Sequence, residues 1–102
     1  MNKLPPYTLK RTSTFKAHVK LAKRRGLDLS LLEEIIDKLV NRIPLEEKNH
    51  DHELTGNYKG FRECHIQPDW LLIYLVDDDV ITLTATDTGT HSDLFSKKNK
   101  KK

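Results

Sequence analysis

The feature that most constrains the fold is a nearly unbroken apolar run, Trp70–Val76, in the second half of the chain. Pro68 and Asp69 precede the run and Asp77–Asp79 follow it, so turn residues bound it on both sides. A strand that is apolar at almost every position is typical of one that is buried on both of its faces. The sequence therefore predicts a central strand at Trp70–Val76.

Shorter patterns predict further strands around this run. Tyr58–Ile66 alternates loosely between apolar and polar residues, and Val80–Thr86 alternates well enough to form the return strand of a hairpin. Tyr7–Leu9, after two prolines, is consistent with a short strand near the amino terminus. His91–Phe95 is expected to form a final turn of helix.

Two amphipathic helices are expected between the first strand and the others. The first spans about Ser13–Arg25, with Gly26 as its C′ residue, and its apolar positions recur at i, i+4 and i+7. The second begins at Ser30, which forms a capping box with Glu33, and Pro44 stops it. Its apolar face follows the helical period and consists of Leu32, Ile35, Ile36, Leu39, Val40 and Ile43.

The order of these elements, β-α-α-β-β-β, predicts an α+β domain in which two N-terminal helices pack on a small, mostly antiparallel sheet. A chain of 102 residues corresponds to one domain, which we place at residues 1–95. The remaining residues, 96–102, are rich in lysine and are expected to be a disordered tail.

Several classes of protein are excluded by composition. No apolar run approaches the ~20 residues that a transmembrane helix needs, and the amino terminus lacks the apolar region of a secretory signal. Cys64 is the only cysteine, which excludes an intramolecular disulfide and a cysteine-based zinc site. We therefore expect a protein of the reducing cytoplasm.

Charge is unevenly distributed along the chain. Residues 1–27 contain eight Lys or Arg and no acid, residues 28–96 contain five Lys or Arg against fifteen Asp or Glu, and the tail adds five lysines; 8 − 10 + 5 gives the net charge of +3. A stripe of Lys16, Lys20 and Lys23 runs beside the apolar face of the first helix. This asymmetry favours a nucleic-acid partner, because Lys and Arg contacts to phosphate dominate such binding. A solvated helix face with a disordered tail would explain it equally well.

Four of the five histidines lie from the middle of the chain onward, at positions 50, 52, 65 and 91. Imidazole titrates near pH ~6.5, so these side chains can donate or accept a proton at physiological pH. RNA cleavage needs a base for the 2′-hydroxyl, an acid for the departing 5′-oxygen and a cation for the phosphate. Lys59 and Arg62 could contact the phosphate, and Trp70 or Phe95 could stack on a base.

Simpler explanations apply to several of these residues. Trp70 opens an apolar strand, where core packing is the more common role, and His50 fits an exposed loop. Arg62 lies three residues before His65, so the two side chains point to opposite faces of a regular strand. A zinc site built from His50, His52 and a third ligand is also conceivable, but H-x-H is a weak motif, so we expect neither a metal nor another cofactor.

The segment DHELTGNYKGFRECHIQPDWLLIYLVDDD, followed by TGTHSDLF, resembles the YafQ branch of the RelE/ParE toxin superfamily. The resemblance covers nearly everything except the tail. It implies a compact RelE-like fold and the toxin half of a bacterial type II toxin–antitoxin pair. Such toxins cut mRNA in the ribosomal A site without a metal, and their expected partners are an antitoxin protein, the ribosome with its mRNA, and operator DNA through the toxin–antitoxin complex.

By this resemblance, acid–base roles fall to His52, His65, Asp69 and His91, and Trp70 and Phe95 match positions around the substrate. His91 or Asp69 is the expected donor to the leaving oxygen. The lysine stripe on the first helix would face ribosomal RNA.

One position departs from the family pattern. YafQ-like toxins carry an arginine just before T-G-T-H, where this chain has Asp87. An aspartate there would repel the phosphate, and two like charges ~4 Å apart cost about 4 kcal/mol at an effective dielectric constant of ~20, before screening. Asp87 therefore favours an alternative, a weakly catalytic subunit that binds an antitoxin in a DNA-binding co-repressor complex. A ribonuclease that acts on free RNA is a third possibility.

Overall fold

The apolar run forms the middle strand of a five-stranded mixed sheet. This strand, β4 (Trp70–Asp77), lies between β3 (Arg62–Gln67) and β5 (Thr82–Gly89), and the complete order is β1-β5-β4-β3-β2. The outer strands are β1 (Thr8–Arg11) and the short β2 (His52–Glu53). The computed structural model describes residues 4–80 and 82–95, so the tail predicted at residues 96–102 lies outside the described residues.

Most strand pairs are antiparallel, as predicted. β2 with β3, β3 with β4, and β4 with β5 are antiparallel, whereas β1 pairs with β5 in parallel. The strand β2 was not predicted, because two residues within a polar segment carry no alternation that could reveal them. This unpredicted strand pairs His52 with Glu63, and it thereby brings a loop histidine onto the sheet.

The first helix, α1 (Ser13–Arg24), starts and ends as the sequence predicts. The hydroxyl of Thr12 accepts a hydrogen bond from the Phe15 N–H and caps the amino end. At the other end Gly26 has φ of +84°, and the N–H of Leu27 donates to the Ala22 carbonyl, as in a Schellman motif.

The second helix, α2 (Leu29–Val40), differs from the prediction at both ends. Its N-cap is Asp28, whose carboxylate accepts from the Ser30 N–H and hydroxyl, so the predicted Ser30–Glu33 capping box is wrong. The helix stops before Pro44 because Arg42 adopts φ of +63°. The Arg42 guanidinium, lying 4.1 Å from the Tyr7 ring and donating to the Pro5 carbonyl, holds that turn. Ile43, predicted to be on the buried face, is consequently 48% exposed.

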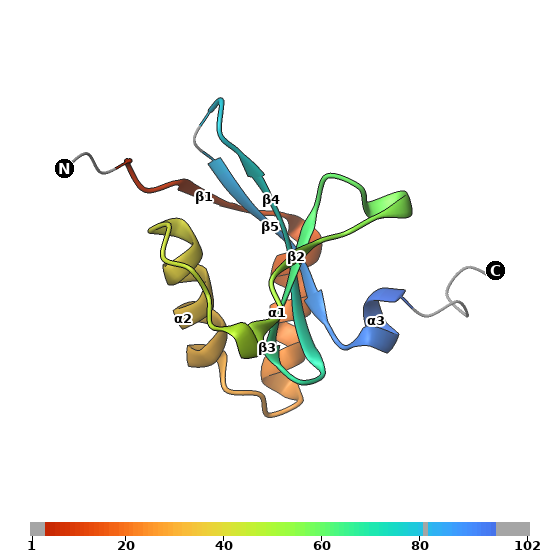
Figure 1. Ribbon diagram of the computed structural model, residues 1–102. Coiled ribbons are helices and arrows are strands. Elements are labelled where there is room, and N and C mark those ends of the chain that lie inside the picture. The colour runs from red at the N-terminus through yellow and green to blue at the C-terminus, as the bar shows by residue number, and fades with distance from the viewer. Residues whose placement is uncertain (1–3, 81, 96–102) are drawn as a thin grey trace.

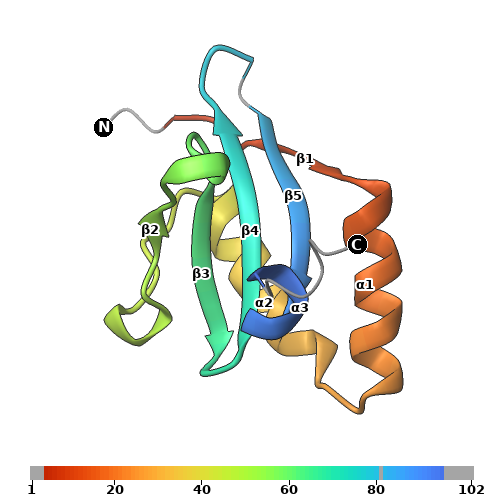
Figure 2. The ribbon, with the colours of Figure 1, turned by 90° about the vertical axis from the view of Figure 1, so that its right-hand side faces the viewer.

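The helices α1 and α2 cover one face of the sheet, and α3 (His91–Phe95) lies on the other (Figures 1 and 2). The core between helices and sheet contains, among others, Phe15, Leu32, Ile35, Cys64, Trp70, Leu72, Tyr74 and Leu83. Leu71 and Ile73 alternate with these residues along β4 and are also fully buried, so β4 is buried on both faces as predicted. These elements confirm the predicted α+β class.

Across the described residues, 4–80 and 82–95, no helix has the length and apolar character that crossing a bilayer requires.

Candidate active site

The site is built on the face of β3 that points away from α1 and α2. Successive residues of a strand point to opposite faces, so Glu63 and His65 share one face while Arg62 and Cys64 share the other. The short 3-10 helix η1 (Glu47–Asn49) and β2 precede β3 along the chain, and β2 forms the edge of the sheet beside it. His50, directly after η1, and His52, in β2, are two more histidines of this region.

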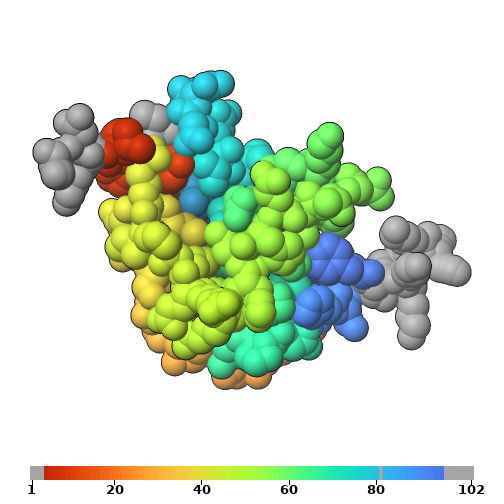
Figure 3. Space-filling view, viewed as in Figure 1, coloured from red at the N-terminus to blue at the C-terminus, as the bar shows by residue number. Residues whose placement is uncertain are grey.

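Four histidines gather there, and we call His50, His52, His65 and His91 the histidine cluster. The ring of His65 is at its centre, with centroids 5.1 Å from the His50 ring and 5.6 Å from the His91 ring, both edge to face. The loop after α2, the β3–β4 turn and α3, which adjoin the cluster along the chain, lie next to one another on one surface of the molecule (Figure 3). The structure thus brings together the predicted His52, His65 and His91.

His91 is held by Asp69, the fourth predicted acid–base residue. The Asp69 carboxylate accepts from both the backbone N–H of His91, at 3.1 Å, and its ring Nδ1, at 3.0 Å. These hydrogen bonds lower the pKa of Asp69 below its ordinary value, so the carboxylate stays ionised. With Nδ1 bonded to Asp69, Nε2 is the ring atom of His91 that is free to exchange a proton with a substrate.

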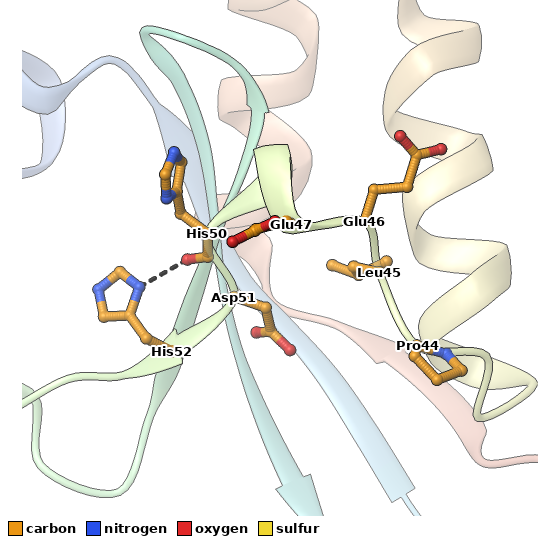
Figure 4. A pocket seen from close by; sticks show the side chains of 7 residues that line it. All are labelled: Pro44, Leu45, Glu46, Glu47, His50, Asp51 and His52. Atoms are coloured by element: carbon orange, nitrogen blue, oxygen red, sulfur yellow. Dashed lines mark hydrogen bonds between the residues drawn. The ribbon is translucent and has the colours of Figure 1, made fainter.

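His52 is fixed by two oxygen acceptors. Its Nδ1 lies 2.6 Å from the backbone carbonyl of His50 (Figure 4), and its Nε2 lies 3.3 Å from the carboxylate of Glu63. Glu63 is only 5% exposed, and the Nε2 of His65 is 3.9 Å from the same carboxylate oxygen. The Glu63 carboxylate thus lies beside two histidines of the cluster and is closer to His52.

The environment of His65 favours its neutral form. Burial lowers the pKa of His65 below its ordinary value, and the neighbouring histidines His50, His91 and His52 lower it further, against an opposing effect of Glu63. A neutral imidazole at physiological pH is able to accept a proton.

Two predicted substrate-binding residues lie outside the histidine cluster. Arg62 points to the opposite face of β3, where its Nε donates to the Tyr74 hydroxyl and is 3.4 Å from Asp51. Trp70 is 2% exposed in the core, and its ring N–H donates to the Thr88 hydroxyl. Neither side chain can reach a substrate at the cluster from this position. For Trp70, the core-packing explanation is the one that its burial supports.

The remaining predicted contacts surround the site at a greater distance. Phe95 on α3 packs edge to face against Tyr58, with ring centroids 5.3 Å apart, and Lys59 follows in the exposed turn before β3. Lys16, Lys20 and Lys23 are exposed on α1, which lies beside β5, whereas β2 forms the opposite edge of the sheet (Figure 2).

Asp87, the position that departs from the family pattern, is bonded to α1. Its carboxylate lies 2.6 Å from the Nδ1 of His18 and also accepts from the N–H of Thr88. The aspartate is therefore part of a link between β5 and α1.

Two members of the site, Glu63 and His50, were not predicted as site residues. Glu63 could have been found from alternation, since it is two residues from His65 and must share its face. His50 is the exposed loop residue that the sequence predicted, and its ring contact with His65 also places it in the cluster. Within the part of the chain that the structure describes, no group of three or more His, Cys, Asp or Glu is arranged to hold a metal ion.

Comparison with known proteins supports the resemblance seen in the sequence. A family model described as "Bacterial toxin of type II toxin-antitoxin system, YafQ" matches residues 7–96. The chain belongs to this family. The mRNA interferase toxin YafQ of Escherichia coli strain K12 is 39% identical to it over 82 residues, which are 79% of this chain and 87% of the relative.

Two solved structures extend the comparison to the fold. The E. coli DinJ–YafQ toxin–antitoxin complex contains a chain 36% identical to this one, with a TM-score of 0.81 over 88% of this chain and 98% of that one. A metal-bound toxin from Helicobacter pylori is 38% identical, with a TM-score of 0.82 over 87% and 99%. The predicted family and RelE-like fold are therefore confirmed.

Proposed function

We propose that this chain is the toxin of a type II toxin–antitoxin pair and an endoribonuclease that cleaves mRNA on the ribosome. The observation that carries the proposal is the convergence of His65, His91 and His52 on one face of the sheet, with Asp69 bonded to His91. Family membership and the name of the E. coli relative, an mRNA interferase, support it.

The geometry suggests a division of roles in which neither proton transfer needs a metal. His65, whose pKa is lowered, removes the proton of the 2′-hydroxyl, and the resulting oxygen attacks the adjacent phosphorus. His91 donates a proton from Nε2 to the departing 5′-oxygen, while Asp69 holds the ring through Nδ1. The products are a 2′,3′-cyclic phosphate and a free 5′-hydroxyl. The ring nitrogens of His52 face the His50 carbonyl and the Glu63 carboxylate, so His52 reaches a phosphate only if one of its N–H groups leaves that oxygen.

The partners follow from the same proposal. An antitoxin would bind this chain, as DinJ is found with YafQ in the E. coli complex. We expect the chain to act on mRNA at the ribosome in the cytoplasm and to contact operator DNA only through the toxin–antitoxin complex. The alternative of a subunit that binds without cleaving rests on Asp87 alone and is not favoured by the relatives, which are named as mRNA interferases.

The test is to induce this chain alone in a bacterium and to map cuts in a translated reporter message by primer extension. We expect growth arrest and cuts in register with codons. The His91→Ala variant should cut about 10²–10⁴-fold more slowly, as expected for loss of a general acid. Glu34→Gln, on the exposed side of α2, serves as the control and should cut normally.

Two outcomes would contradict the proposal in different ways. Undiminished cutting by His91→Ala would exclude the assigned acid. Cutting of purified RNA without ribosomes would instead identify a ribonuclease that acts on free RNA.

A further inference from the structure

We infer that a cavity beside His50 binds one nucleotide of the RNA substrate, next to the scissile phosphate. This inference rests on the proposed function and extends it to a specific subsite. The cavity, which we call the His50 pocket, has a volume of about 530 Å³. Its walls include Leu31, Lys48, His50, His65, Ile66 and Pro68.

The His50 pocket shares two residues, His50 and His65, with the histidine cluster. His65 lines the pocket and also contacts His91 in the cluster, with ring centroids 5.6 Å apart. A nucleotide bound there would therefore place its phosphate beside the two rings that we propose transfer protons. The pocket is also larger than one nucleobase needs.

The chemistry of the walls fits a base attached to a phosphate. Leu31, Ile66 and Pro68 present apolar surface, on which the flat face of a base can lie. His50 adds an aromatic ring, and bases stack on aromatic side chains without regard to sequence. Lys48 adds one positive charge at the entrance, suited to a phosphodiester.

Charge distinguishes this pocket from a second cavity on the other side of His50. That cavity, of about 620 Å³, is lined by Glu46, Glu47 and Asp51 and by no Lys or Arg among the described residues (Figure 4). Three carboxylates repel a phosphodiester, whereas the described residues that line the His50 pocket include no carboxylate. The Nζ of Lys48 does lie 3.6 Å from a carboxylate oxygen of Glu46. Both side chains are exposed, so this ion pair is weak and Lys48 can leave it to bind a phosphate.

The wall formed by His50 is held in place before any ligand arrives. The amide of the buried Asn49 donates to the His65 carbonyl at 2.7 Å, which ties η1 to β3. The carbonyl of His50 itself accepts from the ring of His52. His50 takes a left-handed backbone conformation at the end of η1, with φ of +46°.

The experiment is an NMR titration of the full chain with a single-stranded trinucleotide whose riboses are 2′-deoxy. This probe cannot be cleaved, because it lacks the attacking hydroxyl. We expect the amide signals of Leu31, Lys48, His50 and Ile66 to shift. His50→Asn removes the aromatic ring but tolerates the left-handed backbone, and it should weaken binding about tenfold. His50→Phe should retain binding, and Glu47→Ala in the acidic cavity should not weaken it.

Three results would overturn the inference: shifts confined to residues of the acidic cavity, no shift at all, or equal affinities for the wild type and His50→Asn. Cleavage of a translated message by the same proteins separates this inference from the proposed function. Cleavage without shifts in the pocket would refute only the subsite. Shifts in the pocket without cleavage would refute only the nuclease.

Discussion

At the scale of single residues, Asp87 is the position where the resemblance led us to expect an arginine. The structure shows its carboxylate bonded to His18, 69 positions earlier in the chain. The substitution is visible in the sequence, but its partner is not, because sequence separation says nothing about which helix packs on β5. The bond turns the negative charge toward α1.

We predict that Asp87→Arg raises the rate of RNA cleavage by at least about tenfold, since one well-placed electrostatic donor contributes ~10²–10³. Asp87→Asn, which removes the charge and keeps an oxygen acceptor for His18, should give a smaller gain. Both variants lose part of the link to α1, so thermal unfolding should be measured beside cleavage in the translated-message assay. If neither variant cleaves faster than the wild type, Asp87 does not limit the reaction.

Other site residues show which positions could be predicted from the sequence and which could not. His65, Asp69 and His91 were predicted from chemistry and resemblance, and the structure places them together. Arg62 and Trp70 were assigned to the substrate, but strand alternation and burial direct them to the core side of the sheet. Alternation shows which residues share a face, yet it does not show which face is covered by helices.

At the scale of secondary structure, α3 depends on side chains from elsewhere in the chain. It has five residues, far fewer than the ~12 that a marginally stable isolated helix needs. On one side the Asp69 carboxylate holds His91, and on the other Arg25 of the α1 C-cap bonds Asp93 at 2.8 Å. Asp93 also accepts from the N–H of Thr90 and so caps its own helix.

We predict that Arg25→Ala loosens α3 and displaces His91. Amide hydrogen exchange from Asp93 to Phe95 should become roughly two- to fivefold faster, the range that an exposed ion pair provides. The cleavage rate should fall while the affinity for the ribosome is retained. Arg25→Lys keeps the charge and should recover part of both effects. Unchanged amide exchange in Arg25→Ala would mean that the hydrogen bonds of Asp69 hold α3 in place without Arg25.

The same contact has a defined pH dependence. Hydrogen bonds from Arg25 and from the Thr90 N–H lower the pKa of Asp93 from 3.8 to about 2. Because the pKa is depressed in the folded protein, the stabilisation of α3 is fully present above about pH 4 and is lost as the pH falls through about 2. In Arg25→Ala the pKa of Asp93 should move back toward its ordinary value, so the stabilisation of α3 should be lost at a higher pH than in the wild type. Amide exchange measured at pH 5 and pH 2.5 would detect this change.

At the scale of the whole molecule, basic and acidic segments of the chain lie apart from one another on the folded protein. The exposed lysines of α1 lie beside β5, and the acidic loop with Glu46 and Glu47 lies toward the opposite edge (Figure 2). The sequence predicted a basic stripe, but which side of the sheet it would flank depended on the packing of α1 against β5.

We predict that replacing Lys16, Lys20 and Lys23 together by alanine weakens binding to ribosomes and makes it less sensitive to salt. Each lost phosphate contact should reduce the slope of log K against log salt by about 0.7–0.9, or roughly 2–3 for the triple variant. Sedimentation with ribosomes at several salt concentrations measures the slope, and Lys38→Ala on α2 is the control. An unchanged slope would show that α1 does not face ribosomal RNA.

The parallel pairing of β1 with β5 joins the two ends of the polypeptide. Thr8 is opposite Thr82, and the hydroxyl of Thr12 donates to the carbonyl of Thr86, across more than seventy positions. Synthesis proceeds from the amino terminus, so β1 and α1 must wait for β5 before the sheet can close. His91 follows β5 in the chain, and Asp69, which accepts its hydrogen bonds, precedes β4. The pair therefore cannot form until synthesis has passed His91, and we expect a shorter nascent chain to lack the proposed nuclease activity.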